Sequence, residues 1–233
     1  MKNFKNRAFL LAGVAVFGFS SLAMASPLGI ASITNCDGGG ATVTATTITW
    51  LPTAGTGLGC ITLGLPTSVS YSGGTLTSGT GTIEDLPAGP PPFISLAGGV
   101  LAFGLTAFKT PTPTDGICST TTALASGHSC IISAGSPFLL VSNGATTTVN
   151  LVALGTVTDT GNSSTAPYIG TFSTNSNSDT AAIAATIDTP GGSETNTYSA
   201  TLIVGTPEPA TISMFLLAGV GLIGIGRKRF VKR

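Results

Sequence analysis

The sequence predicts an all-β protein whose central domain, residues 26–206, is an antiparallel β-sandwich. Thr, Ser and Gly are abundant, with 32 glycines, and only 8% of residues are charged, against roughly 25% in typical soluble domains. Short segments rich in β-branched residues alternate polar and apolar positions, and turn-forming clusters separate them. Because no amphipathic helical segment lies between them, we expect two packed sheets of the immunoglobulin-like or jelly-roll-like kind.

The expected strands follow one another along this central domain. Residues 41–50 and 67–71 alternate β-branched residues with Thr, Ser or Ala, and 98–108 is more apolar, as a strand covered on both faces would be. The remaining expected strands are 137–141, 146–159, 167–174, 181–188 and 196–204. A β-solenoid is the alternative because Gly and Thr repetition can imitate one, but no fixed repeat of about 20–30 residues is present.

The first 25 residues have the organisation of a secretory signal peptide. Residues 2–7 supply three cations, residues 8–19 are apolar, and Ala23 and Ala25 form a small-x-small cleavage site for signal peptidase. A retained N-terminal membrane helix is the alternative, which the short apolar run and the cleavage site disfavour. The sequence therefore predicts an exported protein.

Three features follow one another in the C-terminal segment 207–233: a tripeptide with two prolines, an uncharged apolar run and a basic cluster. They are Pro207, Glu208 and Pro209, then residues 210–226, then Arg227, Lys228 and Arg229. The prolines favour an extended backbone of the shape that a protease active site accepts. The apolar run is slightly short of the roughly twenty residues that span a bilayer comfortably, and we expect it to be a transmembrane helix. The basic cluster should stay cytoplasmic.

These three features, in this order and at this spacing, resemble the PEP-CTERM sorting signal of Gram-negative bacteria. The resemblance implies processing near the tripeptide by an exosortase-type membrane peptidase. It also implies transient anchoring in the inner membrane, followed by delivery to the cell surface or the extracellular matrix, where such substrates are associated with exopolysaccharide and biofilm. The Gly/Thr-rich central domain resembles other PEP-CTERM precursors with low specificity, and this assigns it no biochemical role.

Charge is segregated along the chain. Of nine Lys and Arg residues only Lys109 lies between the two basic ends, whereas all nine acidic residues lie between Asp37 and Glu208. This middle part therefore carries a formal net charge of −8, so nucleic acid is not an expected partner.

Four cysteines in an exported chain favour disulfides over thiol or metal chemistry. Three pairings are possible, and we prefer the sequence-local one, Cys36 with Cys60 and Cys118 with Cys130. The segment 118–130 is interpreted as a disulfide-closed hairpin. A four-cysteine zinc site would need paired short C-x₂₋₄-C spacings, which the sequence lacks.

Candidates for catalysis are few, and no catalytic residue or cofactor is predicted. His128 is the single histidine, and no G-x-S-x-G motif surrounds any serine, so a catalytic triad is not expected and a solvent-exposed or capping loop histidine is preferred. Glu84 and Asp85 are the only adjacent acidic pair. Neighbours on a strand point to opposite faces, so this pair cannot act alone across a glycosidic bond.

Two binding alternatives remain open. Asp37, Asp159 and Asp179 lie in Gly-, Asn- or Ser-containing loops that offer oxygen ligands to calcium, but solvated turn aspartates are the preferred interpretation and no metal site is predicted. Trp50 and Tyr71 offer aromatic faces on which a sugar could stack, although a Trp50 packed in the core is preferred.

Together these features predict a non-enzymatic, exported surface or extracellular-matrix protein that exosortase sorts. Its expected partners are signal peptidase, an exosortase-type peptidase, the lipid bilayer for a limited time, and exopolysaccharide. A carbohydrate-binding module is the second hypothesis, and a secreted hydrolase is the third.

Overall fold

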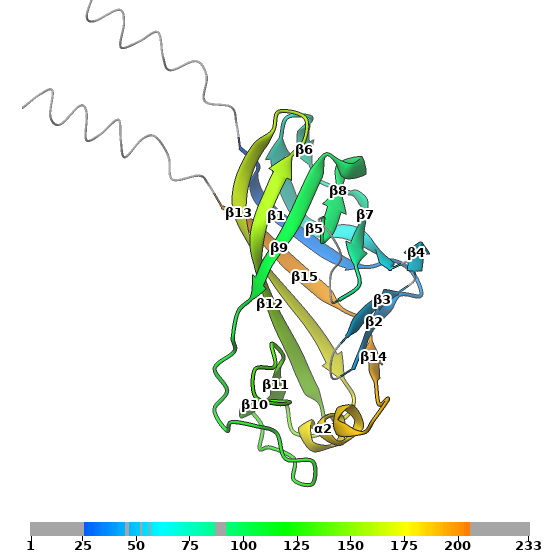
Figure 1. The fold of residues 1–233 in the computed structure, drawn as a ribbon, viewed down its shortest axis with the longest axis vertical. Helices are drawn as coiled ribbons and strands as arrows, with labels where there is room; N and C mark the ends of the chain where they lie inside the picture. Colours follow the sequence, from blue (N-terminus) through cyan, green and yellow to red (C-terminus); the bar gives the residue numbers. More distant parts are fainter. Residues whose placement is uncertain (1–25, 45–46, 52, 56, 87–91, 206–233) are drawn as a thin grey trace, which may run out of the picture.

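The structure, a computed structural model, describes residues 26–44, 47–51, 53–55, 57–86 and 92–205 (Figure 1). The expected signal peptide and the expected C-terminal transmembrane helix lie outside these residues. In the part of the chain that the structure describes, no helix has the length and hydropathy that a bilayer span requires.

The described residues form antiparallel strands, one α-helix and one short 3-10 helix. The larger sheet contains β1 (Leu28–Asn35), β4 (Thr53–Gly55), β5 (Leu58–Tyr71), β6 (Gly74–Leu76), β7 (Gly79–Glu84), β8 (Ile94–Leu96), β9 (Leu101–Phe108), β10 (Ser129–Ile131), β11 (Leu139–Ser142), β12 (Thr147–Asp159), β13 (Ser164–Ser176) and β15 (Ser199–Val204). The smaller sheet contains β2 (Gly40–Val43), β3 (Ile48–Leu51) and β14 (Glu194–Asn196). The helices are η2 (Ala97–Gly99) and α2 (Thr180–Asp188).

The larger sheet closes on itself. Its strands follow the order β12, β13, β15, β1, β5, β7, β8 and β9, and β9 pairs back onto β12 to complete a ring of eight described strands. Strand β9 covers only the half of β12 from Ala153 to Asp159. The other half of β12 pairs with β11, which in turn pairs with β10. These two strands therefore extend below the ring (Figure 1).

This closure corrects the expected sandwich. The prediction of an antiparallel all-β domain is confirmed, but the prediction of two packed sheets is wrong, because the ring is one continuous sheet. Side chains alternate between inside and outside in both architectures, so the sequence pattern cannot distinguish them. The pairing of β9 with β12 decides the architecture, and Gly155 permits it: a Cβ at this position would overlap the carbonyl oxygen of Gly104.

Helix α2 is a second correction, because residues 181–188 were expected to form a strand. Asp179 caps the helix by accepting a hydrogen bond from the Ala182 N–H at 2.8 Å. The segment is rich in alanine, which has the highest helix propensity, and Ile183 and Ile187 face the core one turn apart. The spacing of Ile183 and Ile187 among small residues fits both the two-residue period of a strand and the 3.6-residue period of a helix. The capping aspartate favours the helix.

Both sequence-local disulfides are present. Cys36–Cys60 joins the end of β1 to β5, and Cys118–Cys130 closes the loop that precedes β10, with Cα atoms 5.6 and 5.0 Å apart. The second loop is not the expected hairpin, because the bridge between Ile117 and Ile131 is parallel. Loops of this size stabilise a fold by about 2–4 kcal/mol, chiefly by restricting the unfolded chain.

The hydrophobic core fills the ring and continues beneath the smaller sheet. Inside the ring Phe103 and Tyr168 pack edge to face, with ring centroids 5.1 Å apart. A second hydrophobic cluster lies outside the ring, at the end where α2, β10 and β11 are found (Figure 1). In it Ile183 and Ile187 of α2 pack near Leu140 and the disulfide Cys118–Cys130. The lower disulfide and the helix therefore share one small core.

Candidate functional site

The domain presents its two chain ends side by side. The expected cleavage-site alanines, Ala23 and Ala25, and the whole predicted sorting segment lie outside the described residues. The described chain begins just before β1 and ends just after β15, and these two strands pair with Gly29 opposite Val204. Gly205, the last described residue before the predicted sorting segment, therefore follows a strand that has β13 on one side and β1 on the other (Figure 1).

Trp50 belongs to the core, as expected, so the sugar-stacking hypothesis is wrong for this residue. Its side chain is 2% exposed and packs against Tyr198 and Phe172, with ring centroids 4.7 and 5.5 Å away. The backbone N–H of Trp50 donates a hydrogen bond to the Asp85 carboxylate at 2.7 Å, which joins β3 to the end of β7. Tyr71 is partly buried against the same core.

A cavity of about 40 Å³ lies between the smaller sheet and the ring, beside Trp50 and Tyr198. Among the described residues, the Trp50 indole N–H and the Tyr198 hydroxyl have no hydrogen-bond partner. Burial also raises the pKa of the Tyr198 hydroxyl, so this group stays neutral. The cavity has room for one or two water molecules but not for a sugar ring.

Asp159 is buried, which corrects the expectation of a solvated turn aspartate. Its carboxylate accepts hydrogen bonds from the Ser72 N–H at 2.5 Å, the Ser72 hydroxyl at 2.7 Å and the Gly161 N–H at 2.9 Å. Burial alone would raise the pKa of Asp159, but these donors outweigh it and hold the pKa below its ordinary value. Asp159 therefore ties the β5–β6 turn to the β12–β13 turn.

The other acidic candidates also have structural roles or stand apart. Asp179 caps α2, and Asp85 binds the backbone of β3, so each carboxylate already has a backbone donor. Asp37 lies in the exposed turn after β1. Within the described ranges, no three His, Cys, Asp or Glu side chains gather in the way that a metal site requires.

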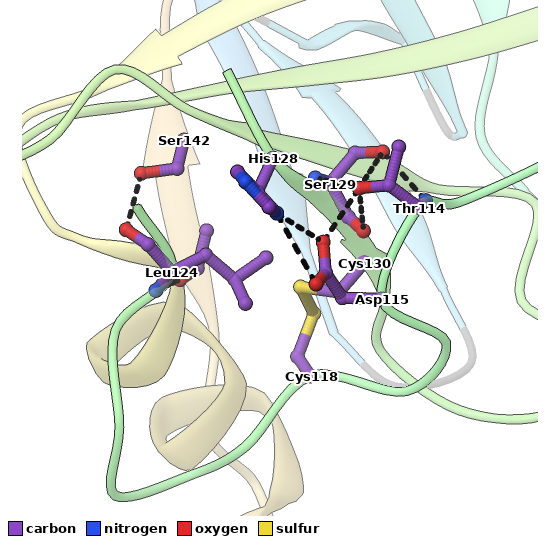
Figure 2. Close-up of polar contacts among 9 residues, drawn as sticks. Thr114, Asp115, Cys118, Leu124, His128, Ser129, Cys130 and Ser142 are labelled. Atoms are coloured by element: carbon purple, nitrogen blue, oxygen red, sulfur yellow. Dashed lines mark hydrogen bonds and ion pairs between the residues drawn. A yellow bond between two sulfur atoms is a disulfide. The ribbon is translucent and has the colours of Figure 1, made fainter. Parts of the chain in front are cut away.

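His128 and Asp115 form the one ion pair found among the described residues (Figure 2). The imidazole Nδ1 lies 2.9 and 3.2 Å from the two carboxylate oxygens, and the Thr114 hydroxyl donates to the same carboxylate. The hydrogen bond from Thr114, followed by that from His128, lowers the pKa of Asp115. A carboxylate at Nδ1 is the arrangement that orients a general base in a catalytic triad.

The two serines nearest this pair in Figure 2 are engaged elsewhere. The Ser129 hydroxyl accepts from the Thr114 N–H at 3.1 Å, and the Ser142 hydroxyl donates to the Leu124 carbonyl at 2.8 Å. The His128 side chain is 53% exposed. The pair therefore fastens the loop before β10, in agreement with the expected loop histidine, and lacks a positioned nucleophile among the residues drawn.

A groove of about 270 Å³ lies beside the part of β12 at which its pairing partner changes from β11 to β9. Lys109, the only Lys or Arg among the described residues, lines this groove, and its backbone N–H donates to the Val152 carbonyl at 2.8 Å. Asn150 and Thr112 add an amide and a hydroxyl, and Leu139 adds an apolar surface. The sequence marks Lys109 as the lone cation of an acidic domain, but only the fold places it beside a groove.

The comparisons with known proteins bear on the C-terminal segment. The family model described as the PEP-CTERM protein-sorting motif matches residues 206–229. This match confirms the prediction that the C-terminal segment is a PEP-CTERM sorting signal. The match begins at the residue after Gly205, where the described domain ends. The comparison with curated proteins and the comparison with solved structures gave no match.

Proposed function

We propose that this PEP-CTERM sorting-domain protein, an exported substrate of exosortase-type machinery, is a non-enzymatic constituent of the cell surface or extracellular matrix. The observation that carries the proposal is the sorting motif at residues 206–229, attached directly to a folded β domain. The domain is held together by two disulfides, which persist in the oxidising conditions outside the cytoplasm.

The non-enzymatic part of the proposal is supported by the engagement of the chemically capable side chains. Asp159, Asp85 and Asp179 accept backbone hydrogen bonds that hold turns, strands and a helix in place. The His128–Asp115 pair is solvent-exposed, and the serines beside it bond to other groups. A secreted hydrolase would need a nucleophile or a second carboxylate facing one of these groups.

The sorting route follows from the position of the motif. The Pro207-Glu208-Pro209 tripeptide lies in the sequence between the domain and the apolar run 210–226, so a membrane peptidase can reach it without unfolding the ring. The basic cluster at residues 227–229 holds the tail on the cytoplasmic side until cleavage. The acidic domain is then released to the surface, where its hydroxyls and carboxylates keep it hydrated among polysaccharides.

The proposal is tested by replacing both prolines, Pro207→Ala and Pro209→Ala, in the full chain in its native host. We expect the variant to accumulate in the membrane fraction with its C-terminus intact, while the unaltered protein is found outside the cell. A matched control, Pro167→Ala on the outer face of β13, should be sorted normally. Normal release of the double variant would contradict exosortase sorting through this tripeptide.

A carbohydrate-binding role is the second candidate, and the Lys109 groove favours it. A cation, an amide and a hydroxyl beside an apolar surface suit a sugar unit that bears one carboxylate, because the ring can lie on the apolar side chains while its polar groups are bonded. We expect Lys109→Gln or Asn150→Ala to weaken retention on an acidic polysaccharide, and Thr80→Ala on β7 to leave it unchanged. Equal retention of all three variants would contradict this role.

A further inference from the structure

Exposed aliphatic side chains gather on one wall of the ring. The described residues contain six large hydrophobic side chains classed as exposed, and five of them belong to the neighbouring strands β13, β15, β1 and β5. These five, which we call the aliphatic wall, are Leu28, Ile30, Leu65, Ile169 and Ile203, with exposed fractions from 41% to 88%. The sixth is Ile117, which immediately precedes Cys118 of the second disulfide.

Strand register makes the centre of this wall continuous. Ile203 of β15 lies opposite Ile30 of β1 on one side and opposite Ile169 of β13 on the other. The row continues to Leu154 of β12, which pairs with Ile169. Directly opposed residues on one face of a sheet have Cβ atoms about 4.5–5.5 Å apart, so these side chains touch across the strands. Single exposed hydrophobic residues are common, but a continuous row indicates a contact surface.

The wall also lacks charge. Strands β13, β15, β1 and β5 contain no Asp, Glu, Lys or Arg, and the residues flanking the row are hydroxyl-bearing, such as Ser32, Thr171 and Thr201. Every acidic residue of the described chain lies outside these four strands. An anionic membrane surface would therefore repel the rest of the domain more strongly than this wall.

The position of the sorting segment indicates what covers the wall. Strand β15 lies within it, and only residues 206–209 separate Gly205 from the apolar run at 210–226. Four extended residues reach at most about 14 Å. The polar layer of a bilayer is about 5–7 Å thick on each side. While the apolar run is inserted, Ile203 is therefore held at or near the lipid headgroups.

We infer that the aliphatic wall lies against the lipid bilayer for as long as the sorting segment is attached. This contact orients the ring, directs the acidic surfaces away from the membrane and holds the Pro-Glu-Pro tripeptide at a fixed depth for the peptidase. Cleavage removes the tether and with it the high effective concentration of the wall at the membrane, so the domain is released. The inference rests on the proposed function, because it requires the run 210–226 to be in the bilayer.

The test uses the full chain in vesicles of phosphatidylethanolamine and phosphatidylglycerol that contain lipids with brominated acyl chains, which quench nearby tryptophan fluorescence. The reporter Ile203→Trp is on the wall, and the matched reporter Ser95→Trp is on the outward face of β8, four strands from β15 in either direction around the ring. The native Trp50 is buried and supplies a constant background. We expect quenching several-fold stronger at the wall reporter, reduced when Ile30→Thr and Leu65→Thr are added and unchanged by Ile117→Thr.

Three results would overturn the inference, and they point to different causes. If alkaline carbonate extracts the chain from the vesicles, the apolar run is not inserted, and the membrane step of the proposed function fails as well. If the chain resists extraction but the wall reporter is not quenched, or is quenched no more than the β8 reporter, only the bilayer contact fails. A wall reporter shielded from aqueous acrylamide yet insensitive to brominated lipid would show that the sorting segment or a second copy covers the wall.

Discussion

The ring of strands that carries both ends of the described chain contrasts with the lower region of Figure 1, residues 109–131 and helix α2. In the ring, backbone pairing joins every strand to two neighbours. In the lower region, position depends on individual side chains: Asp179 caps α2, Asp115 binds His128, and Cys118 is bonded to Cys130. We infer that a change at the seam between β9 and β12 disturbs the whole domain, whereas a change in the lower region acts locally.

The largest expected effect is at that seam. Gly155→Ala would bring a Cβ into the Gly104 carbonyl oxygen and close to the Tyr168 ring, so β9 and β12 must separate. We expect a loss of about 3 kcal/mol or more in the free energy of unfolding, measured by urea denaturation. Gly104→Ala is the matched control, because the nearest atom to its Cβ would be 3.7 Å away. Equal stability of the two variants would contradict the account of closure.

The next effect separates the two regions directly. Replacing Cys118 and Cys130 by Ser should cost about 3 kcal/mol. Because the loop they close contacts α2 but not the interior of the ring, hydrogen exchange should accelerate in residues 109–131 and α2 while β13 and β15 stay protected. Accelerated exchange throughout the ring would show that the two regions unfold together.

Asp159 is the buried carboxylate that joins the β5–β6 turn to the β12–β13 turn. Replacing it should lower the free energy of unfolding by an amount comparable to the loss of the second disulfide, and this loss should depend on pH. Asp159→Asn replaces a carboxylate that accepts three hydrogen bonds, for an expected loss of about 2 kcal/mol at neutral pH. The pKa of Asp159 is lower in the folded than in the unfolded protein, so its contribution is present above about pH 4 and is lost as the pH falls through the folded value. The stability difference between the native protein and Asp159→Asn should therefore shrink below about pH 4. A constant difference would contradict this role.

The helix cap in the lower region should matter less. Asp179→Ala removes the acceptor for the Ala182 N–H and should lower the free energy of unfolding by about 1 kcal/mol. Asp179→Asn retains a capping oxygen and should restore most of the loss. A loss as large as that of Asp159→Asn would show that α2 supports the ring after all.

The smallest effect on stability is expected on the aliphatic wall. Ile203→Thr keeps a β-branched side chain at an exposed position, so thermal unfolding in detergent should change by less than about 0.5 kcal/mol. Any larger loss would mean that Ile203 contributes to packing, and that its exposure does not mark a contact surface.

The sequence predicts the features that are local in the chain and misses those that depend on distant contacts. Alternation identifies β12 and much of β13, the proximity of the cysteines gives both disulfides, and the apolar character of Trp50 places it in the core. The seam requires Gly155 to meet Gly104, a contact that no local pattern encodes. The capping role of Asp179 is encoded locally, and an alanine-rich segment after an aspartate is the signal that identifies α2.

The candidate sites also divide into one that is local in the sequence and two that depend on contacts between distant residues. The sorting motif is a contiguous segment and is recognised from the sequence alone. The Lys109 groove and the aliphatic wall each combine residues from several strands. The register of β13, β15 and β1 is what turns three isoleucines, far apart in the sequence, into one row.

The most direct test of the central claim, sorting through the PEP-CTERM motif, is the intact mass of the protein recovered from the membrane and extracellular fractions of its native host. We expect the extracellular form to lack residues 1–25 and the sequence beyond the Pro-Glu-Pro tripeptide, with both disulfides formed. An extracellular form that still contains residues 210–233 would contradict sorting by cleavage at this motif.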